Sequence, residues 1–227
     1  MIRRRRLAEI QRRLAERAVL VGRPEAELVA GVDAAYTGTH AFAAAVVVDV
    51  RSMQVVERVA ACQRVHLPYI PGYFAFREMG AAIKALRRLK SRADVLLVNG
   101  HGAAHPRRCG IATHLGVLLR MPAIGVASRL LCGRVEQGKE PAPVVHSGEV
   151  VGYALHCGRA VYVSPGHGIS AENAAALVAG LPFRKHLPLP LHEAHATAEA
   201  VKKRIINGDA EIIFEGEGYG KGERIHR

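Results

Sequence analysis

The chain of 227 residues lacks tryptophan and has only six tyrosines and five phenylalanines. Its four cysteines, Cys62, Cys109, Cys132 and Cys157, form no CxxC pair, which argues against a zinc ribbon and a dense disulfide framework. It contains no run of about 20 apolar residues, so no membrane-spanning helix is expected. We therefore expect a soluble protein with reduced thiols.

The start of the chain also lacks a secretory signal pattern. Its first 20 residues are basic, and charged residues interrupt the apolar stretch that a signal peptide needs. Leu7, Ile10 and Leu14 instead share one face of a predicted amphipathic helix over residues 1–20. We interpret this segment as a solvated surface helix rather than a nucleic-acid-binding arm, and expect the protein in the cytoplasm.

Acidic residues are outnumbered by basic ones. The chain has 32 Lys and Arg against 20 Asp and Glu, a formal net charge of +12. Such an excess commonly accompanies polyanionic partners. It favours nucleic acid as the partner over a merely basic surface.

One domain is expected over residues 1–210, followed by a flexible glycine-rich tail over 211–227. Apolar stretches separated by turn residues predict a three-stranded antiparallel meander, whose first strand ends at Asp33. The other two strands are "AFAAAVVVDV" and "QVVERVAACQ". A helix is predicted from Phe74 to Lys90, and then strand "DVLLV", helix "CGIATHLGVLL" and strand "AIGVA".

Two short strands are predicted next, between Val144 and His156. The segment "AVYVSPGHGIS" predicts a strand that passes through a Pro-Gly turn into a helix capped by Ser170. The last predicted helix is "LHEAHATAEAVKKR". This order predicts an α/β fold with a mixed sheet and flanking helices, as in ribonuclease H-like folds.

Polar side chains end two of the predicted strands, Asp33 and Asn99. If these strands are neighbours, both side chains face one crevice at the edge of the sheet, where α/β folds bind ligands. Glu78 lies on the intervening helix. Such oxygen donors suit Mg²⁺, which binds through one or two carboxylates and substrate phosphate. Each acid taken alone is more often a solvated or capping residue.

The loop "HGAAHPRRCG" follows Asn99 and opens a helix. Its glycines permit close backbone approach, Arg107 and Arg108 can contact phosphates, and the free amides of a helix N-terminus attract anions. An ordinary basic loop is the alternative.

Tyr69 stands between Pro68 and an Ile-Pro-Gly turn in "LPYIPGYFAFRE", so we expect its ring to be held outside the core. A rigid side chain of this kind can insert between bases and help to extrude one. The alternative is a tyrosine packed at the edge of a loop.

These segments together resemble the endonuclease V family. The resemblance rests on "AGVDAAY", "LPYIPGYFAFRE", "VNGHGAAHPRRCGIATHLGVLL", "PAIGVASRLLCG" and "VYVSPGHGIS", which occur in this order from about Val29 to Ala196. It implies a ribonuclease H-like fold and a nuclease that uses Mg²⁺, or Mn²⁺ in its place. The substrate would be DNA or RNA containing inosine, cut at the second phosphodiester bond on the 3′ side to leave a 3′-hydroxyl and a 5′-phosphate. A monomer without membrane attachment is expected.

The resemblance also assigns roles to residues. Asp33, Glu78, Asn99 and His195 take catalytic positions, with the metal on Asp33 and Asn99. Tyr69 matches the wedge that fills the gap left by a flipped base. The other expected substrate contacts are Gly72, Gly102, His105, Arg107, Gly110, His114, Ser128 and His167.

Three positions depart from the family pattern. Asn99 stands where the family has a second metal-binding Asp, Ser128 where it usually has Lys, and Gly168 where it usually has Arg. These differences remove charges near the metal and the substrate, so weakened cleavage is predicted. Two alternatives stay open: a non-catalytic homologue that binds inosine or other nucleic acid, and an engineered inactive variant.

A zinc site on one face of the last predicted helix is a further alternative. His192, His195 and Glu199 would form it. The segment "HEAH" is one residue short of the HExxH spacing, which makes this the weaker interpretation.

Overall fold

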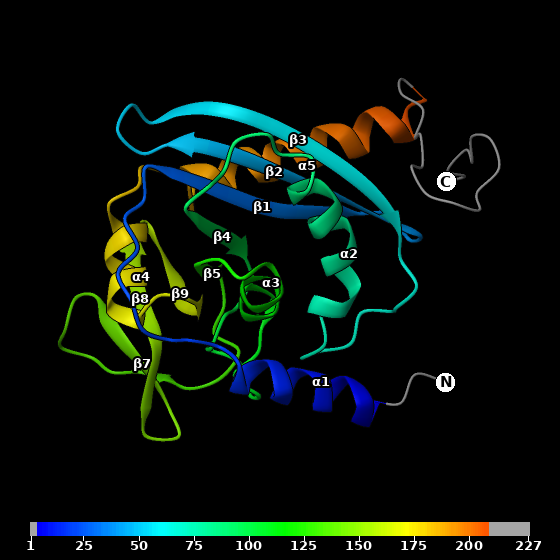
Figure 1. Ribbon diagram of the computed structural model, residues 1–227. Coiled ribbons are helices and arrows are strands. Elements are labelled where there is room, and N and C mark those ends of the chain that lie inside the picture. Colours follow the sequence, from blue (N-terminus) through cyan, green and yellow to red (C-terminus); the bar gives the residue numbers. More distant parts are fainter. Residues whose placement is uncertain (1–3, 209–227) are drawn as a thin grey trace.

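The computed structural model describes residues 4–208, in which helices cover both faces of a central mixed sheet (Figure 1). The sheet has nine strands in the order β3-β2-β1-β4-β5-β9-β8-β7-β6. This arrangement confirms the predicted α/β architecture. The predicted flexible tail over 211–227 lies outside the described residues. Over residues 4–208, no helix is both long and apolar enough to cross a membrane.

Short connections join most of the elements. The helices are α1 (Arg4–Glu16), α2 (Ala75–Leu86), α3 (Ile111–Leu119), α4 (Ala171–Ala179) and α5 (Leu189–Ile206). The strands of the large sheet are β1 (Leu28–Tyr36), β2 (His40–Asp49), β3 (Gln54–Arg64), β4 (Val95–Asn99), β5 (Ala123–Ala127), β6 (Arg134–Val135), β7 (Ala142–His146), β8 (Glu149–Cys157) and β9 (Arg159–His167). A small separate sheet pairs β10 (Phe183–Arg184) with β11 (Leu187–Pro188).

The first three strands form the predicted antiparallel meander. The prediction that the first strand ends at Asp33 is wrong, because β1 continues to Tyr36 and pairs with β2 as far as Ala41. On its other side, β1 runs parallel to β4, and the last residues paired there are Val32 and Val98. Asp33 and Asn99 are the next residues on the two strands. They therefore lie beside each other just beyond the last parallel pair.

Alternate residues of β1 and β4 face two apolar layers. Val32 and Val98 belong to the layer that packs against α2 and α3, whereas Val29 and Leu97 belong to the layer that includes residues of α4 and α5. All four side chains are at most 2% exposed. Burial on both faces is typical of parallel strands between helices, and it leaves the end of the sheet as the place for polar groups.

The expected Pro-Gly turn after residue 163 is wrong, because Pro165 and Gly166 lie within β9. Pro165 is paired with Ile124 of β5 at a point where the register between the two strands shifts. A proline lacks a donor for the ladder, and such an irregularity is where a strand tolerates it. The predicted helix cap is confirmed, because Ser170 Oγ accepts a hydrogen bond of 3.2 Å from the amide of Asn173.

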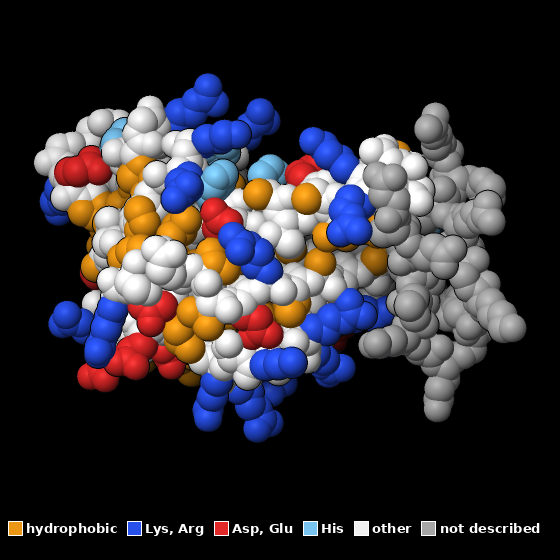
Figure 2. Space-filling model, turned by 90° about the horizontal axis from the view of Figure 1, so that it is seen from above, with side chains coloured by type: hydrophobic (Ala, Val, Ile, Leu, Met, Phe, Trp, Pro, Cys, Tyr) orange, Lys and Arg blue, Asp and Glu red, His pale blue; other side chains and the backbone are white. Residues whose placement is uncertain are grey.

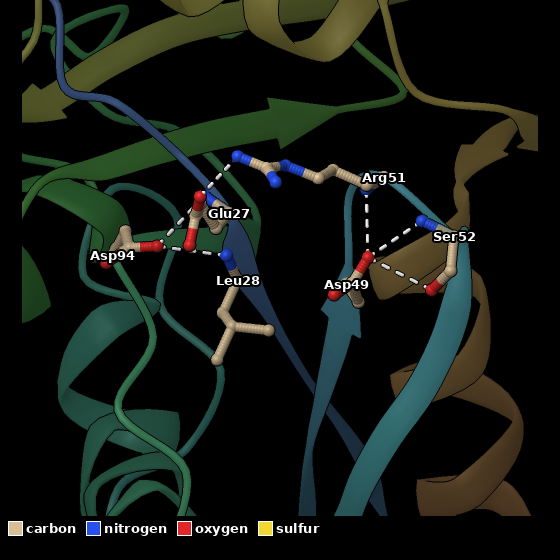
Figure 3. A network of polar contacts seen from close by, with 6 residues as sticks. All are labelled: Glu27, Leu28, Asp49, Arg51, Ser52 and Asp94. Atoms are coloured by element: carbon tan, nitrogen blue, oxygen red, sulfur yellow. Dashed lines mark hydrogen bonds and ion pairs between the residues drawn. The ribbon is translucent and has the colours of Figure 1, made fainter.

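The end of the sheet away from Asn99 is tied by carboxylates that accept backbone hydrogen bonds (Figure 3). Asp94 binds the amides at the start of β1, and Asp49 closes the turn after β2. These acids are satisfied locally, so they have structural roles. The donors are the amides of Glu27 (3.0 Å) and Leu28 (2.9 Å) to Asp94, and of Arg51 (2.9 Å) and Ser52 (2.7 Å) to Asp49.

Helix α1 confirms the predicted amphipathic helix and lies along one side of the molecule, below α3 in Figure 1. Leu14 packs with Cys109 and Val117, and Gln11 is buried beside them. The arginines of the helix remain exposed. The buried face therefore fixes α1 to the loop that precedes α3.

Candidate functional site

Asp33 is the centre of a hydrogen-bonded cluster where β1 passes the end of β4. Nδ2 of Asn99 donates to Oδ1 of Asp33 at 3.0 Å, and Nδ1 of His195 lies 2.8 Å from Oδ2. The side chain of Asp33 is 8% exposed, whereas that of His195 is 52% exposed. Each carboxylate oxygen of Asp33 therefore has a polar neighbour. The Asp33 side chain is nearly buried, whereas its partner His195 is half exposed to water.

A glycine in β1 lets α5 approach closely enough to form this cluster. A Cβ atom on Gly31 would lie 2.3 Å from the carbonyl of Pro190, which is far inside van der Waals contact. Pro190 is in the first turn of α5, where proline is favoured because its missing N–H needs no partner. The close crossing of α5 over β1 brings His195 to Asp33.

Two groups near Asp33 have shifted pKa values. Burial raises the pKa of Glu78 well above its ordinary value, and the nearby charge of Asp33 raises it further. Glu78 projects from α2 and is 5% exposed. The hydrogen bond to Asp33 raises the pKa of His195. The cluster thus favours a neutral carboxyl group at Glu78 and a protonated imidazole at His195.

A pocket of about 430 Å³ opens beside the cluster. It lies between the ends of β1, β4 and β5, the start of α3 and the segment before α2. Nine of the predicted site residues line it, so the structure gathers most of them around one cavity. They are Asp33, Tyr69, Gly72, Glu78, Asn99, His105, Gly110, Ser128 and His195.

Tyr69 stands on the rim of this pocket with 66% of its surface exposed. Its ring lies outside the core, as predicted, and contacts Phe74 edge-on with ring centres 6.0 Å apart. The ring of Tyr36 lies on the other side of Phe74, at 6.4 Å. The rim therefore has an aromatic wall, while the wedge role of Tyr69 stays a prediction.

The wall opposite the cluster is made by two loops that are bonded to each other. The carbonyl oxygen of Gly72 accepts from Nη2 of Arg107 at 2.6 Å and lies 3.1 Å from Nε2 of His105. Burial, with a smaller contribution from Arg107, lowers the pKa of His105 to about 4. Arg107 also stacks over Tyr73, 4.4 Å from the ring centre. It lies behind the pocket wall, and its expected contact with substrate stays a prediction.

Three further predicted residues do not line the pocket. Gly102 donates its amide to Ser164 and has no room for a side chain, because a Cβ would lie 2.3 Å from the carbonyl of Pro165. His114 is buried in α3 against Phe76, with 5.1 Å between ring centres. Nδ1 of His167 lies 3.2 Å from the amide of Val19. Their roles toward substrate stay predictions.

The other two departures from the family pattern lie in different surroundings. Ser128 is exposed at the pocket, next to Arg129, which also lines it. Gly168 has a φ of +63°, a conformation that favours glycine. An arginine there would be strained, so this difference involves the backbone as well as the charge.

Basic side chains are spread over the face of the molecule that Figure 2 shows. In the view from above, Lys and Arg are distributed around the visible face rather than gathered in one patch (Figure 2). The excess of positive charge therefore favours polyanions in general, and the pocket must supply any selectivity.

Some pocket residues were missed by sequence reasoning, among them Gln11, Tyr36, His101 and Arg129. Gln11 left a signal, because it occupies the apolar face of an arginine-rich helix at the spacing of Leu7 and Leu14. His101 belongs to the predicted loop, and its Nε2 lies 2.9 Å from the carbonyl of Arg129. Nothing in the local sequence marks Tyr36 as a pocket residue.

The zinc alternative finds no support in the structure. His195 is turned to Asp33, and Glu199 pairs with Lys202 at 2.7 Å. Within residues 4–208, no three His, Cys, Asp or Glu side chains are placed to hold one metal ion together.

Asp33, Asn99 and Glu78 could offer oxygen donors to a divalent cation. Asn99 turns its amide nitrogen, not its oxygen, toward Asp33. A half-turn about its terminal bond would present the oxygen but would break that hydrogen bond. Burial favours the neutral form of Glu78, which makes this carboxyl group a poorer ligand for a cation. Metal binding therefore competes with the present hydrogen bonds.

Comparisons with known proteins identify the family of the chain. The family model of Endonuclease V matches residues 9–196. Endonuclease V of Thermofilum pendens is 48% identical over 176 residues, which cover 75% of this chain and 76% of that protein.

Among solved structures, Endonuclease V of Streptomyces avermitilis superposes with a TM-score of 0.83 at 33% identity, over 92% of this chain and 95% of that one. Ciona intestinalis Endonuclease V, solved with a 24-mer DNA that contains an inosine followed by a ribo-adenosine, gives a TM-score of 0.78 at 25% identity, over 88% and 98%. These matches confirm the ribonuclease H-like fold. The chain therefore belongs to the endonuclease V family.

Proposed function

We propose that the protein recognises inosine in DNA or RNA and cleaves the second phosphodiester bond on its 3′ side, with Mg²⁺ and at a reduced rate. The observation that carries this proposal is the single pocket shared by Asp33, Glu78, Asn99 and His195 and by the loops of Gly72 and Gly110. The proposed hydrolytic and base-binding groups thus line the same cavity. Membership of a family of metal-dependent nucleases supports the same conclusion.

Base capture is assigned to the rim and the loop wall. A base that leaves the helical stack is replaced there by Tyr69, whose ring is exposed and backed by Phe74. The extruded base enters between Gly72 and Gly110, which both line the pocket. A related protein, that of Ciona intestinalis, was solved with DNA containing inosine, which supports this substrate class.

Cleavage is assigned to the Asp33 cluster. Water attacks phosphorus in line and the 3′ oxygen departs, which leaves a 3′-hydroxyl and a 5′-phosphate. Asp33 orients the water, and the imidazole of His195, hydrogen-bonded to Asp33, contacts the phosphate. Asp33 and the amide oxygen of Asn99 would hold Mg²⁺, with Glu78 beside them, and the ion would stabilise charge on the leaving oxygen.

A second candidate function is inosine binding without cleavage. The hydrogen bond from Asn99 to Asp33 favours it, because the amide nitrogen occupies the carboxylate oxygen that a cation needs. The loop wall and the aromatic rim do not depend on this hydrogen bond. Base capture would therefore survive the loss of hydrolysis.

An end-labelled strand with one inosine tests the proposal. The protein is incubated with this strand and with an adenosine control in Mg²⁺, in Mn²⁺ and in chelator, and the products are sized. Cleavage only of the inosine strand, at the second bond on the 3′ side and only with metal, is expected. Tight inosine-selective binding without product would favour the second candidate, and equal cleavage of both strands would refute base recognition.

A further inference from the structure

Among the described residues, Gln11 is the only buried side chain that carries an amide group. It belongs to the N-terminal helix α1 rather than to the sheet. It is 1% exposed. Its Nε2 donates to the carbonyl oxygens of Gly72 and Cys109, each at 3.0 Å, and its Oε1 accepts from Nε of Arg107 at 2.7 Å. One side chain thus joins α1 to both loops of the pocket wall.

These hydrogen bonds use both amide protons of Gln11. The joined segments lie far apart in sequence, since Gly72 is 61 residues and Cys109 is 98 residues from Gln11. Gln11 itself lines the pocket together with Gly72 and Gly110. The distance between the two loops is therefore set in part by one amide group that spans them.

The two loops are also joined directly, because the carbonyl oxygen of Gly72 accepts from Arg107 and lies 3.1 Å from Nε2 of His105. Gly72 has a φ of +76°, and a Cβ there would lie 2.9 Å from Nη2 of Arg107, so the turn approaches Arg107 with no side chain between them. Arg107 binds the same carbonyl oxygen of Gly72 and is itself held by Oε1 of Gln11. Loss of the Gln11 amide would remove one hydrogen bond to Gly72 and the acceptor that holds Arg107, so the turn would be held only by an unsupported Arg107 and by His105.

We propose that Gln11 is a positioning residue for base selection, which sets the width of the pocket between Gly72 and Gly110; this inference rests on the proposed inosine recognition. Hypoxanthine is guanine without its 2-amino group, so a wall held at fixed width can admit the smaller base and reject the larger one. A widened wall would accept both. Gln11 acts through the loops and takes no part in hydrolysis.

Two substitutions separate the hydrogen bonds from the packing. Gln11→Glu keeps the length and an acceptor for Arg107 but removes both donors and places a carboxylate against two carbonyl oxygens. Gln11→Met keeps the volume and removes every hydrogen bond. Leu14→Ala is the matched control, because it loosens the apolar contact of α1 with Cys109 and Val117 without touching the amide.

Fluorescence anisotropy in chelator gives the dissociation constants of two strands that carry guanosine or inosine at one position. The quantity compared is the guanosine constant divided by the inosine constant. Both Gln11 variants lose the two hydrogen bonds that the amide donates, so both should lower this ratio about tenfold. Leu14→Ala should leave the ratio unchanged. Amide hydrogen exchange in residues 70–73 and 105–110 should accelerate in both Gln11 variants.

The outcomes are distinguishable. A wild-type ratio of one would overturn the proposed function and this assignment with it. A high wild-type ratio that both Gln11 variants retain would overturn the assignment alone. An equal fall of the ratio in Leu14→Ala would also overturn it, because general docking of α1 would then account for selectivity.

Discussion

Replacing Asn99 by aspartate should increase the proposed nuclease activity. The amide nitrogen of Asn99 lies 3.0 Å from Oδ1 of Asp33. In Asn99→Asp two carboxylates would face each other, and like charges about 4 Å apart repel by about 4 kcal/mol at an effective dielectric constant of 20. A divalent cation between them reverses the sign, because both carboxylates then attract it.

Two readouts follow from this reversal. Without metal, Asn99→Asp should melt at a lower temperature than the wild type, and Mg²⁺ should raise its melting temperature far more than that of the wild type. If about 2 kcal/mol of the added attraction survives screening, metal affinity rises about 30-fold, and cleavage at subsaturating Mg²⁺ should rise by a similar factor. Mn²⁺ accepts the same oxygen donors and should partly rescue the wild type.

The assay needs two controls. Asn99 precedes Gly100, and Asn-Gly sequences deamidate readily, so peptide mass spectrometry must verify the amide in the wild-type sample. Gln137→Glu makes the same charge change at an exposed position outside the pocket and should alter neither readout. A fully amidated wild type that cleaves inosine strands as fast as Asn99→Asp would refute the reasoning. Absence of cleavage by both would show that Ser128 or Gly168 also blocks hydrolysis.

Other predictions concern the rim, the core and the crossing of α5. Tyr69→Ala should weaken binding to an inosine duplex about tenfold more than binding to a single strand, because stacking is worth about 1–3 kcal/mol per base and a single strand has less of it to replace; equal losses in paired titrations would make Tyr69 a packing residue. Burial lowers the pKa of His114 to about 4, so the unfolded chain binds more protons between pH 6.5 and pH 4, and stability falls as pH falls through that window. Urea unfolding should therefore show a loss from pH 7 to pH 5 that is about 2 kcal/mol smaller in His114→Leu than in the wild type, and identical losses would contradict the assignment. Gly31→Ala should cost about 1–3 kcal/mol in thermal unfolding because its Cβ meets the carbonyl of Pro190, whereas Gly38→Ala, with nothing within 4 Å, should be neutral; similar melting of the two variants would show that α5 can shift.

The sequence predicted the elements better than their ends. Period-two and helical patterns located the meander and the parallel strands, because those patterns record which side chains are buried. The end of β1 was misplaced because its last residues pair with β2, and this pairing depends on a partner strand rather than on the residues of β1. Pro165 was predicted in a turn because its place in the ladder depends on a shift of register against β5.

Some residues of the candidate site could likewise be predicted from the sequence, whereas their contacts could not. Asn99 and Tyr69 were found because each lies at a strand end or beside a turn, positions that leave local signals. Asp33 was found although β1 continues beyond it to Tyr36. The hydrogen bond between Asp33 and His195 depends on how closely α5 crosses Gly31, and the part played by Gln11 depends on two loops far away in sequence. Contacts between distant segments of this kind require the packed fold.

Recognition of inosine by the pocket is tested most directly by titrating the wild-type protein with two strands that differ only in one base, inosine or adenosine, in chelator so that no strand is cut. The inosine strand should bind at least about tenfold more tightly, as expected for about 1–3 kcal/mol of discrimination at one base. Raising the salt concentration should weaken both complexes by similar factors, because phosphate contacts are common to them. Equal dissociation constants for the two strands at every salt concentration would contradict the account.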